Sequence, residues 1–307
     1  MSASDLLPLP CYLDGQYGVL PDARVSVMDR GFIFGDGVYE VVPVYGRAPF
    51  RIHQHLARLE RSLSELRIAN PYDDATWRGI VATLVERYDA GPWSAGQKAA
   101  KLIYLQVTRG VAMREHPMLP GLVPTVFAMC SALPRPGQEL REHGIACVTA
   151  DDFRWEKAHI KSTSLLGAVM ARQISVDAGA AETLMFRHGF LSEAAASNIW
   201  VVKDGAIQGP PKNHLVLEGI RYGYLEELCA RHGVPFRLRP ISRDEVLAAD
   251  ELLITSASKE ILPITTLDGQ PVGDGRPGAV YRVLRQAYDD DIAAIMLANI
   301  PEQGEAG

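Results

Sequence analysis

The amino-acid sequence predicts an α+β protein built from two domains. Its 307 residues exceed the length at which one hydrophobic core usually stops growing. Strand and helix patterns are mixed in the first third of the chain, as an α+β unit requires. The segment SALPRPGQE then interrupts them with prolines and a glycine, which is typical of a linker. We therefore expect a smaller N-terminal α/β domain at residues 1–131, a linker at 132–138 and a larger domain at 139–307.

The N-terminal region opens with signals of antiparallel strands. Asp14-Gly15 separates two short strand-like runs, which predicts a tight hairpin. The β-branched run VYEVVPVY predicts a longer strand that turns at Gly46. Apolar residues then recur at spacings of three and four from Ile52 to Leu66, which predicts an amphipathic helix, and a second helix is expected over 73–88. Two further strands are expected at residues 101–110 and 121–130.

The second half also mixes strands and helices. A strand is expected at 144–150 and a helix over 164–176. Three hydroxyl residues stand near the start of that helix and are candidates for its N-cap: Ser162, Thr163 and Ser164. Later signals are hairpins at His188-Gly189 and Asp204-Gly205, a helix near 218–231 and a capping box from Ser242 to Glu245.

Composition and charge narrow the class of partner. The formal charge of −6 comes from interspersed acidic and basic residues, which argues against a nucleic-acid or membrane-surface patch and favours a small-molecule partner. Four scattered cysteines without a C-x-x-C pair fit a reducing compartment. The N-terminus lacks a signal-peptide pattern, and no apolar run approaches the roughly 20 residues that a membrane span needs. We therefore expect a soluble, cytoplasmic chain with no membrane or nucleic-acid partner.

Two short motifs are better explained without a ligand. Gly273, Gly275 and Gly278 spell G-x-G-x-x-G, but a dinucleotide fingerprint needs a strand before it and a helix opening within it, and Pro277 lies inside. His53 and His55 are two residues apart on a predicted helix, so they point to different faces. We expect both histidines at the surface and no metal site.

Lys161 attracts attention because of its setting. It follows Ile160 and precedes a largely apolar helix, so its amine could lie in a partly desolvated pocket, where burial favours the neutral, nucleophilic form. The alternative from the residues alone is a solvated lysine. Taken alone, Glu193 and Arg58 are equally compatible with ordinary surface positions, and Arg114 and His116 with a charged loop tip.

A resemblance to a known family, carried by segments along almost the whole chain, decides between the functional and the solvated reading of these residues. They are DRGFIFGDGVYEVV, QVTRG, IKSTSLLGAVMARQ, LSEAAASN, LEGIRYG, ELLITSASKEILPI and DGQPVGDG. In order and spacing they resemble the pyridoxal-phosphate enzymes of fold type IV, which include D-amino acid transaminases, branched-chain aminotransferases and aminodeoxychorismate lyase. The resemblance implies a two-domain fold whose larger C-terminal domain has a barrel-like sheet. It also implies a homodimer in which loops of one subunit complete the site of the other.

The resemblance assigns roles around pyridoxal 5′-phosphate. Lys161 becomes the Schiff-base lysine, Glu193 the carboxylate that keeps the pyridine nitrogen protonated, and Arg58 the cation at the phosphate. The remaining assignments are Leu217 packed against the ring and backbone amides of Ile220, Arg221, Ser256 and Ala257 around the phosphate. Relatives usually carry a threonine at Arg221 and often a hydroxyl residue at Ala257. Whether the Arg221 side chain contacts phosphate or solvent stays open.

A group of three residues bears on which amino acid is accepted. Arg114 and His116 fall where D-amino acid transaminases bind the substrate carboxylate, and Tyr39 supplies an accompanying hydroxyl. The resemblance therefore implies transfer of the amino group from D-alanine or a similar donor to 2-oxoglutarate, giving pyruvate and D-glutamate. The alternatives are an L-branched-chain aminotransferase, an aminodeoxychorismate lyase and, in a different class, a non-catalytic protein that binds pyridoxal phosphate.

Overall fold

The computed structural model describes residues 6–94, 96 and 99–298, and the chain divides into two compact units. Unit 1 comprises the chain up to Pro134, the short stretch Lys161–Ser164 and the residues from Asp291 onwards. Unit 2 comprises Arg135–Ile160 and Leu165–Asp290. The stretch Lys161–Ser164 is notable, because the boundaries expected from the sequence place it in the second domain.

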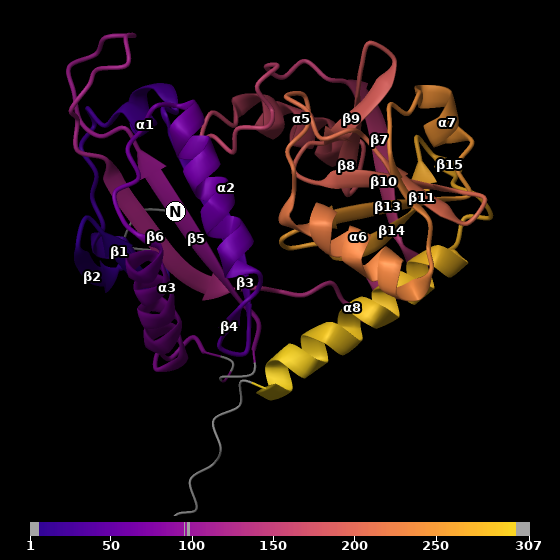
Figure 1. The fold of residues 1–307 in the computed structure, drawn as a ribbon, viewed down its shortest axis with the longest axis horizontal. Helices are drawn as coiled ribbons and strands as arrows, with labels where there is room; N and C mark the ends of the chain where they lie inside the picture. The colour runs from indigo at the N-terminus through magenta and orange to yellow at the C-terminus, as the bar shows by residue number, and fades with distance from the viewer. Residues whose placement is uncertain (1–5, 95, 97–98, 299–307) are drawn as a thin grey trace, which may run out of the picture. The chain divides into compact units, whose positions relative to one another are not determined.

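Unit 1 is built on an antiparallel sheet of six strands in the order β2-β1-β6-β5-β3-β4. Helices α2 and α3 pack on one face of this sheet (Figure 1). Their apolar sides and the inward residues of β3 and β5 form one core. The elements are β1 (Pro10–Leu13), β2 (Gln16–Val19), a 3₁₀ turn (Leu20–Asp22), α1 (Arg30–Phe34), β3 (Gly37–Tyr45), β4 (Ala48–Pro49), α2 (Ile52–Glu65), α3 (Asp74–Asp89), β5 (Lys101–Thr108) and β6 (Thr125–Ala132).

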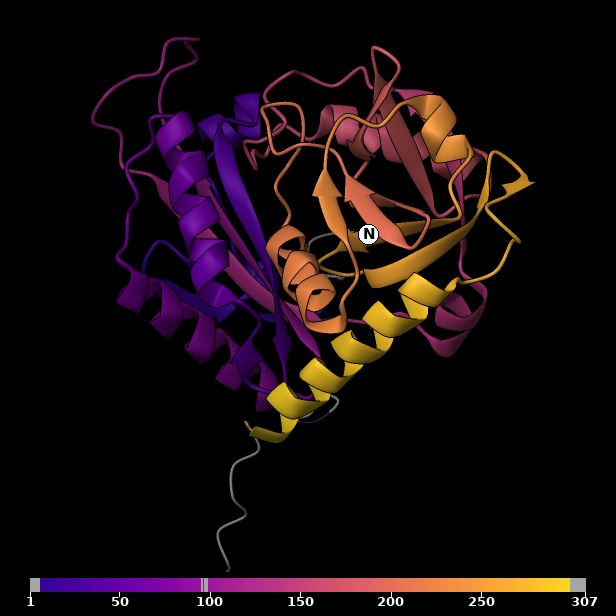
Figure 2. The same ribbon diagram turned by 45° about the vertical axis from the view of Figure 1, so that its right-hand side comes forward.

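Unit 2 contains a mixed sheet of nine strands that curls into a half-barrel (Figure 2). The path runs β12-β11-β10-β13-β14-β7-β8-β9, with β15 paired to β14, and its interior holds a second apolar core. The strands are β7 (Ile145–Asp151), β8 (Glu182–Arg187), β9 (Phe190–Ala194), β10 (Asn198–Lys203), β11 (Ala206–Gly209), β12 (Phe236–Leu238), β13 (Glu251–Ser256), β14 (Glu260–Leu267) and β15 (Gln270–Pro271). The helices are α4 (Gln138–His143), α5 (Leu166–Asp177), α6 (Ile220–His232) and α7 (Arg243–Leu247). The last helix, α8 (Ala279–Ala298), belongs to unit 2 up to Asp290 and to unit 1 from Asp291.

Most local sequence signals are confirmed, and the α+β class with them. Asp14 has a φ of 45° and Gly15 of 92°, the left-handed pair that a two-residue hairpin requires. Asp73 caps α3 by accepting from the amide of Thr76, and the capping box from Ser242 to Glu245 forms in full. These features depend on neighbours in the chain, which is why the sequence predicts them.

The expected N-cap of α5 is wrong. The helix begins at Leu166, and Leu165 occupies the cap position without a side-chain hydrogen bond. The hydroxyls of Thr163 and Ser164 instead donate to the carbonyl of Gly35, at 2.9 and 3.0 Å. They are unavailable to the helix because they attach Lys161–Ser164 to unit 1.

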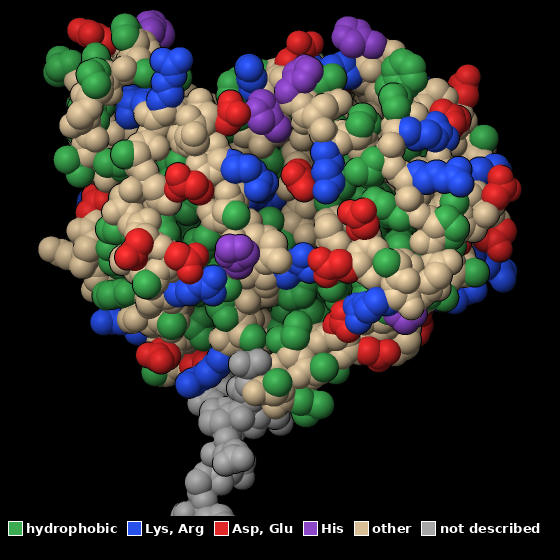
Figure 3. Space-filling view, in the orientation of Figure 1, with side chains coloured by type: hydrophobic (Ala, Val, Ile, Leu, Met, Phe, Trp, Pro, Cys, Tyr) green, Lys and Arg blue, Asp and Glu red, His purple; other side chains and the backbone are tan. Residues whose placement is uncertain are grey.

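The glycine-rich segment of the C-terminal region precedes α8, a helix that the sequence analysis did not predict. The strand before it, β15, has only two residues and pairs antiparallel with β14. The three glycines therefore lie outside any βαβ unit, in agreement with the rejection of a dinucleotide fingerprint. Among the described helices, none is both long and apolar enough to cross a bilayer. Acidic and basic side chains are interspersed on the face shown in Figure 3, as the sequence suggests.

Candidate active site

Lys161 is fixed to unit 1 through its own backbone. Its amide donates to Ser62 Oγ on α2 at 3.2 Å, and its carbonyl accepts from the amide of Tyr39 on β3 at 3.0 Å. The next residues continue along β3, where Ser162 pairs with Val38. With both backbone groups bound to neighbouring elements, the lysine side chain starts from a well-defined position.

The side chain of Lys161 lies over the ring of Tyr39. The distance from Nζ to the ring centroid is 4.0 Å, within the range of a cation–π contact. Tyr39 in turn stacks on Tyr104 of β5, with ring centroids 5.8 Å apart. The structure thus brings together two residues that the sequence analysis selected for different reasons, the lysine for the cofactor and the tyrosine for the substrate.

Arg58 belongs to a buried cluster on the same helix as Ser62. Its Nε and Nη2 donate to the two oxygens of Glu40, at 2.7 and 2.8 Å. The other member is His55, whose Nδ1 lies 2.7 Å from Glu40 Oε2. His55 is 2 % exposed, so the expectation of a surface position is wrong for it, although it holds for His53. The reason is that the helix turns His55 inward beside Arg58, where Glu40 offers a partner.

The charge of Glu40 is secured by this cluster. Burial acts to raise the pKa of the carboxyl, but the charge of Arg58 and the hydrogen bonds from Arg58 and His55 hold it well below its usual range. Glu40 is therefore a permanent carboxylate that fixes the fork of Arg58 in one orientation. Whether Arg58 binds a phosphate, as the resemblance implies, stays a prediction.

Arg114 and His116 lie together on the ring of Phe34, at the end of α1. The guanidinium carbon of Arg114 and the ring of His116 are each 5.5 Å from the Phe34 ring centroid. Arg30 anchors the loop by donating to the carbonyls of Glu115 and His116, at 2.5 and 3.4 Å. Both side chains are exposed, and each of them contacts the Phe34 ring.

Glu193 occupies a buried position on β9 of unit 2. Its Oε1 accepts from Arg154 Nη1 at 2.9 Å. Its Oε2 accepts from the amide of Leu217 at 3.1 Å and from Asn198 Nδ2 at 3.4 Å. It is 5 % exposed, so the reading as an ordinary surface acid is excluded.

The ionisation of Glu193 is finely balanced. Burial raises the pKa of its carboxyl to about 7, against the opposing charge of Arg154. Arg154 is shared with Asp152, which it contacts through both Nε and Nη2 at 2.9 Å. Burial also acts to raise the pKa of Asp152, yet the hydrogen bonds and charge of Arg154 hold this pKa at about 2. Asp152 thus receives most of the stabilisation of negative charge that Arg154 can provide.

Asn198 connects the segments that the sequence analysis assigned to the cofactor. Its Nδ2 also donates to the carbonyl of Leu217 at 2.9 Å, and its backbone pairs with Thr255 at the end of β13. A Cβ on Gly219 would lie 2.1 Å from Asn198 Oδ1, so only glycine fits before α6. Through these contacts Glu193, Leu217, the start of α6 and the end of β13 are neighbours in unit 2.

The start of α6 offers amide donors. Gly219 is the N-cap and makes no side-chain cap, so the first amides, including those of Ile220 and Arg221, are not covered by a side chain at that position. The open question about Arg221 is answered in part. Its side chain is buried, and Nη2 donates to Tyr288 Oη on α8 at 2.8 Å, so it does not point to solvent. Ser256 and Ala257 follow β13 at the turn into β14.

Sequence reasoning missed Arg154, Asp152 and Asn198. The first two lie in the segment DDFRWEK and the third ends LSEAAASN, but their partners are up to 40 residues away. The only available signal was the charged cluster just before Lys161. Together with Glu193 they form a buried polar cluster around a balanced carboxylate, with amide donors nearby. Such a cluster can accept a positive group beside the carboxylate and an anionic group at the amides.

Comparisons with known proteins agree on one family. The family model described as amino-transferase class IV matches residues 37–267. D-alanine aminotransferase of Bacillus licheniformis is 36% identical over 88% of this chain and 93% of its own length. The corresponding enzyme of Staphylococcus epidermidis is 34% identical over 91% of this chain and 96% of its own. In fold, the branched-chain aminotransferase of the archaeon Thermoproteus uzoniensis with norvaline superposes with a TM-score of 0.82, at 23% identity, over 94% of this chain and 97% of that one.

Proposed function

The chain belongs to the class IV aminotransferases, and on this premise we propose that it transfers the amino group of a D-amino acid to a 2-oxo acid. D-Alanine or a similar amino acid is the donor and 2-oxoglutarate the acceptor, so that pyruvate and D-glutamate are the products. The observation that carries the D-specific part is the pairing of Arg114 and His116 on the Phe34 ring. The similarity to the D-alanine aminotransferases of Bacillus licheniformis and Staphylococcus epidermidis supports it.

Pyridoxal 5′-phosphate is the cofactor that fits these residues. When bound, it supplies an electron sink for the negative charge that develops at the substrate Cα. Glu193, with its pKa near 7, holds a proton at the ring nitrogen and gains a compensating positive charge there. The amides at the start of α6 and at Ser256 and Ala257 bind the phosphate, with Arg58 as cation and Leu217 against the ring.

Lys161 is the Schiff-base lysine and the proton carrier of the reaction. Its backbone is bound on both sides, so its amine returns to the same position after each proton transfer. Once the substrate amino group has taken the place of Lys161 at the cofactor, the freed amine of Lys161 would take up the proton of the substrate Cα and hold it for return. The Tyr39 ring, 4.0 Å from Nζ, limits the directions that the amine can take.

Arg114 and His116 determine which enantiomer presents its Cα–H to Lys161. A guanidinium fork binds a carboxylate in a fixed plane, and a second donor from His116 removes the remaining rotation. Tyr39 adds a hydroxyl to the same carboxylate. With the carboxylate held in this way, only one hand of the amino acid places its α-hydrogen toward the lysine.

A homodimer is part of the proposal, and the support for it in this chain is an apolar surface on α5. Leu166, Val169 and Met170 are 74%, 61% and 56% exposed, at the spacing of one helical face. A second copy of the chain would cover such a face. We expect sedimentation to give a dimer, and Val169→Glu to shift it towards monomer; a wild-type monomer at micromolar concentration would contradict this.

The function is tested with enantiomeric donors. Purified protein with pyridoxal phosphate is assayed with D-alanine, L-alanine and L-leucine, each with 2-oxoglutarate. We expect rapid formation of pyruvate from D-alanine and at least about 100-fold slower turnover of both L-donors. Turnover of L-leucine alone would instead establish the branched-chain alternative. A yellow protein that no donor bleaches would establish cofactor binding without catalysis.

A further inference from the structure

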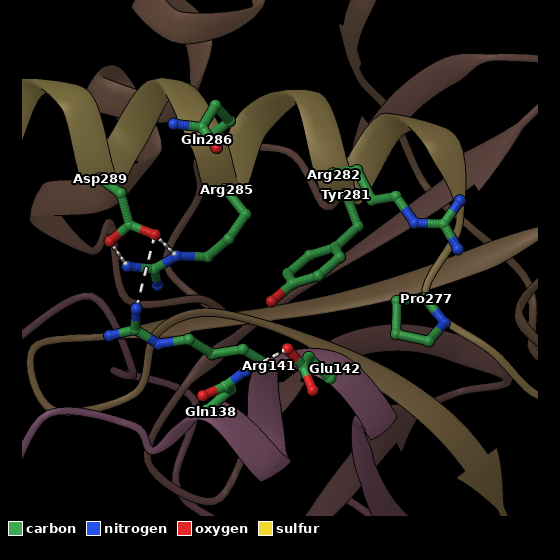
Figure 4. A pocket seen from close by; sticks show the side chains of 9 residues that line it. All are labelled: Gln138, Arg141, Glu142, Pro277, Tyr281, Arg282, Arg285, Gln286 and Asp289. Carbon is green, nitrogen blue, oxygen red and sulfur yellow. Dashed lines mark hydrogen bonds and ion pairs between the residues drawn. The ribbon is translucent and has the colours of Figure 1, made fainter.

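A pocket lies in unit 2 between α4 and α8, and none of the residues that line it is assigned to catalysis. Its volume is about 640 Å³, within the range of small-molecule sites. Its walls come from Gln138–Glu142 on α4 and from Tyr281–Asp289 on α8, segments that are far apart in the chain (Figure 4). Its polar lining includes three arginines, Arg141, Arg282 and Arg285.

One arginine of this pocket is tightly held. Arg285 Nε donates to Asp289 Oδ2 at 2.8 Å, and Nη2 lies 2.8 Å from Glu260 Oε2. Arg135 approaches the same two carboxylates, at 2.6 Å from Glu260 and 3.1 Å from Asp289. Both acids therefore already have close guanidinium partners.

Arg141 is held far more loosely. Its Nη1 lies 3.5 Å from Asp289 and its Nη2 3.6 Å from Glu260, at or beyond the limit of a hydrogen bond. Its Nε is buried and finds no hydrogen-bond partner among the described residues. A buried guanidinium N–H without an acceptor is unfavourable, so the edge of Arg141 has capacity for an added acceptor.

Tyr281 presents a second donor of the same kind. The residue is 2 % exposed, and within the described part of the chain its hydroxyl has no hydrogen-bond partner. Figure 4 shows the hydroxyl directed into the space between Arg285 and Arg141. Burial raises the pKa of Tyr281 to about 12, so the group is protonated at neutral pH and can donate.

The charges that line the pocket decide the sign of its ligand. Arg141, Arg282 and Arg285 face two acids, Glu142 and Asp289. Asp289 is engaged by arginine, and Glu142 is exposed and accepts from Gln138 at 2.6 Å. The groups without a close partner are thus donors, and a cation entering the pocket would meet positive charge. An anion would satisfy Arg141 and Tyr281 together.

We propose that this pocket binds a small oxyanion, the carboxylate or phosphate group of a low-molecular-weight metabolite, between Arg141 and Tyr281. The edge of Arg141 supplies Nε and an Nη in the fork geometry that oxyanions accept, and the Tyr281 hydroxyl supplies a third hydrogen bond. Arg282, exposed at the wall, adds positive charge. The residues of this site belong to unit 2, whereas Arg114 and His116 belong to unit 1.

The test uses the protein saturated with pyridoxal phosphate, so that the phosphate site proposed at the start of α6 is already filled. Inorganic phosphate and succinate are titrated separately by calorimetry, and the melting temperature is recorded with each. The variants are Arg141→Gln and Tyr281→Phe, with Arg237→Gln as matched control, because Arg237 is an exposed arginine on β12. The phenylalanine variant keeps the shape of the side chain, so it tests the hydroxyl even if the Arg141 variant folds poorly.

We expect saturable binding of at least one probe and a rise in melting temperature with its concentration. Arg141→Gln should weaken binding at least about tenfold and Tyr281→Phe about fivefold, while Arg237→Gln binds like wild type and all three variants keep transaminase activity. The probe that binds identifies the preferred oxyanion. Failure of both probes to bind, or equal affinity in wild type, Arg141→Gln and Tyr281→Phe, would overturn the proposal. Arg114→Gln is titrated as well. Loss of binding in this variant, with binding retained in Arg141→Gln and Tyr281→Phe, would assign the anion to the proposed substrate site and would also overturn the proposal.

Discussion

Each unit contains one deeply buried glutamate among the candidate site residues, and the two are compensated in opposite ways. Glu40 in unit 1 accepts hydrogen bonds from Nε and Nη2 of Arg58 and has a contact with His55, and its pKa lies well below the usual range. Glu193 in unit 2 has one bond from an arginine that Asp152 also holds, and burial raises its pKa to about 7. The same side chain is therefore a fixed anion in one unit and a balanced acid in the other.

The difference shows how a buried carboxylate acquires a structural or a chemical task. A carboxylate whose negative charge is already balanced by basic side chains can orient those partners, but a bound ligand would stabilise it little further. A carboxylate with partial compensation gains a great deal when a positive group is placed beside it. On this basis Glu40 positions Arg58 within the protein, whereas Glu193 can still gain from a positive group, which is the role proposed for it at the ring nitrogen of the cofactor.

The largest effect is expected from Glu193→Gln. A neutral amide cannot hold the ring-nitrogen proton, so kcat with D-alanine should fall roughly 10³-fold, about 4 kcal/mol in the barrier. The fold should persist, because Asp152 keeps its two bonds to Arg154. Single-turnover kinetics measure the effect, with exposed Glu226→Gln as control. Equal rates in both variants would show that Glu193 has no part in the chemistry.

Glu40→Gln should affect stability instead. Removing one charge from a buried ion pair leaves Arg58 without its compensating charge, and we expect a loss of about 3 kcal/mol in the free energy of unfolding. Urea denaturation measures it, with exposed Glu86→Gln on α3 as control. If this variant unfolds like wild type, Glu40 is not the structural anion described above.

The pH dependence of stability should differ in sign between the two acids. The pKa of Glu193 is raised by folding, so its contribution is present at low pH and lost as pH rises towards 7. Without cofactor, wild type should therefore lose about 2 kcal/mol relative to Glu193→Gln between pH 5 and pH 7. The contribution of Glu40 is lost only as pH falls, because its pKa is lowered. Parallel stability curves for wild type and Glu193→Gln would contradict the balance assigned to Glu193.

The smallest effect is expected at the loop that carries Arg114. Arg114→Gln leaves the cluster around Glu40 intact and removes the charged contact proposed for the substrate carboxylate. KM for D-alanine should rise about tenfold, and the preference for D- over L-alanine should shrink. Steady-state assays with both enantiomers measure this, with exposed Arg24→Gln as control. An unchanged enantiomer ratio would place the specificity elsewhere.

The sequence predicted those parts of the fold that depend on local spacing. The hairpin at Asp14-Gly15, the helix from Ile52 and the capping box at Ser242 all follow from residues within a few positions of one another. The N-cap of α5 failed because Thr163 and Ser164 bind the distant Gly35. Such competition between local and long-range hydrogen bonds cannot be read from a pattern of residue types.

The candidate members of the site came from the sequence and stay predictions, whereas the contacts that these residues make could not be predicted. Lys161, Glu193 and Arg58 were selected by resemblance, yet His55 was expected at the surface and Arg154 was not considered. Both errors have one cause, since the partners Glu40 and Glu193 lie 15 and 39 residues away from them. Burial and charge compensation are properties of the folded chain, and they decide the roles of these residues.

Titration of the two glutamates tests the central contrast most directly. Carbon-13 NMR of glutamate carboxyl groups, with Glu193→Gln and Glu40→Gln to assign the signals, follows each acid in protein free of cofactor. The signal lost in Glu193→Gln should titrate with a pKa of about 7, and the signal lost in Glu40→Gln should remain that of a carboxylate down to the lowest pH at which the protein is folded. A Glu193 signal that is fully ionised at pH 5 would contradict the account.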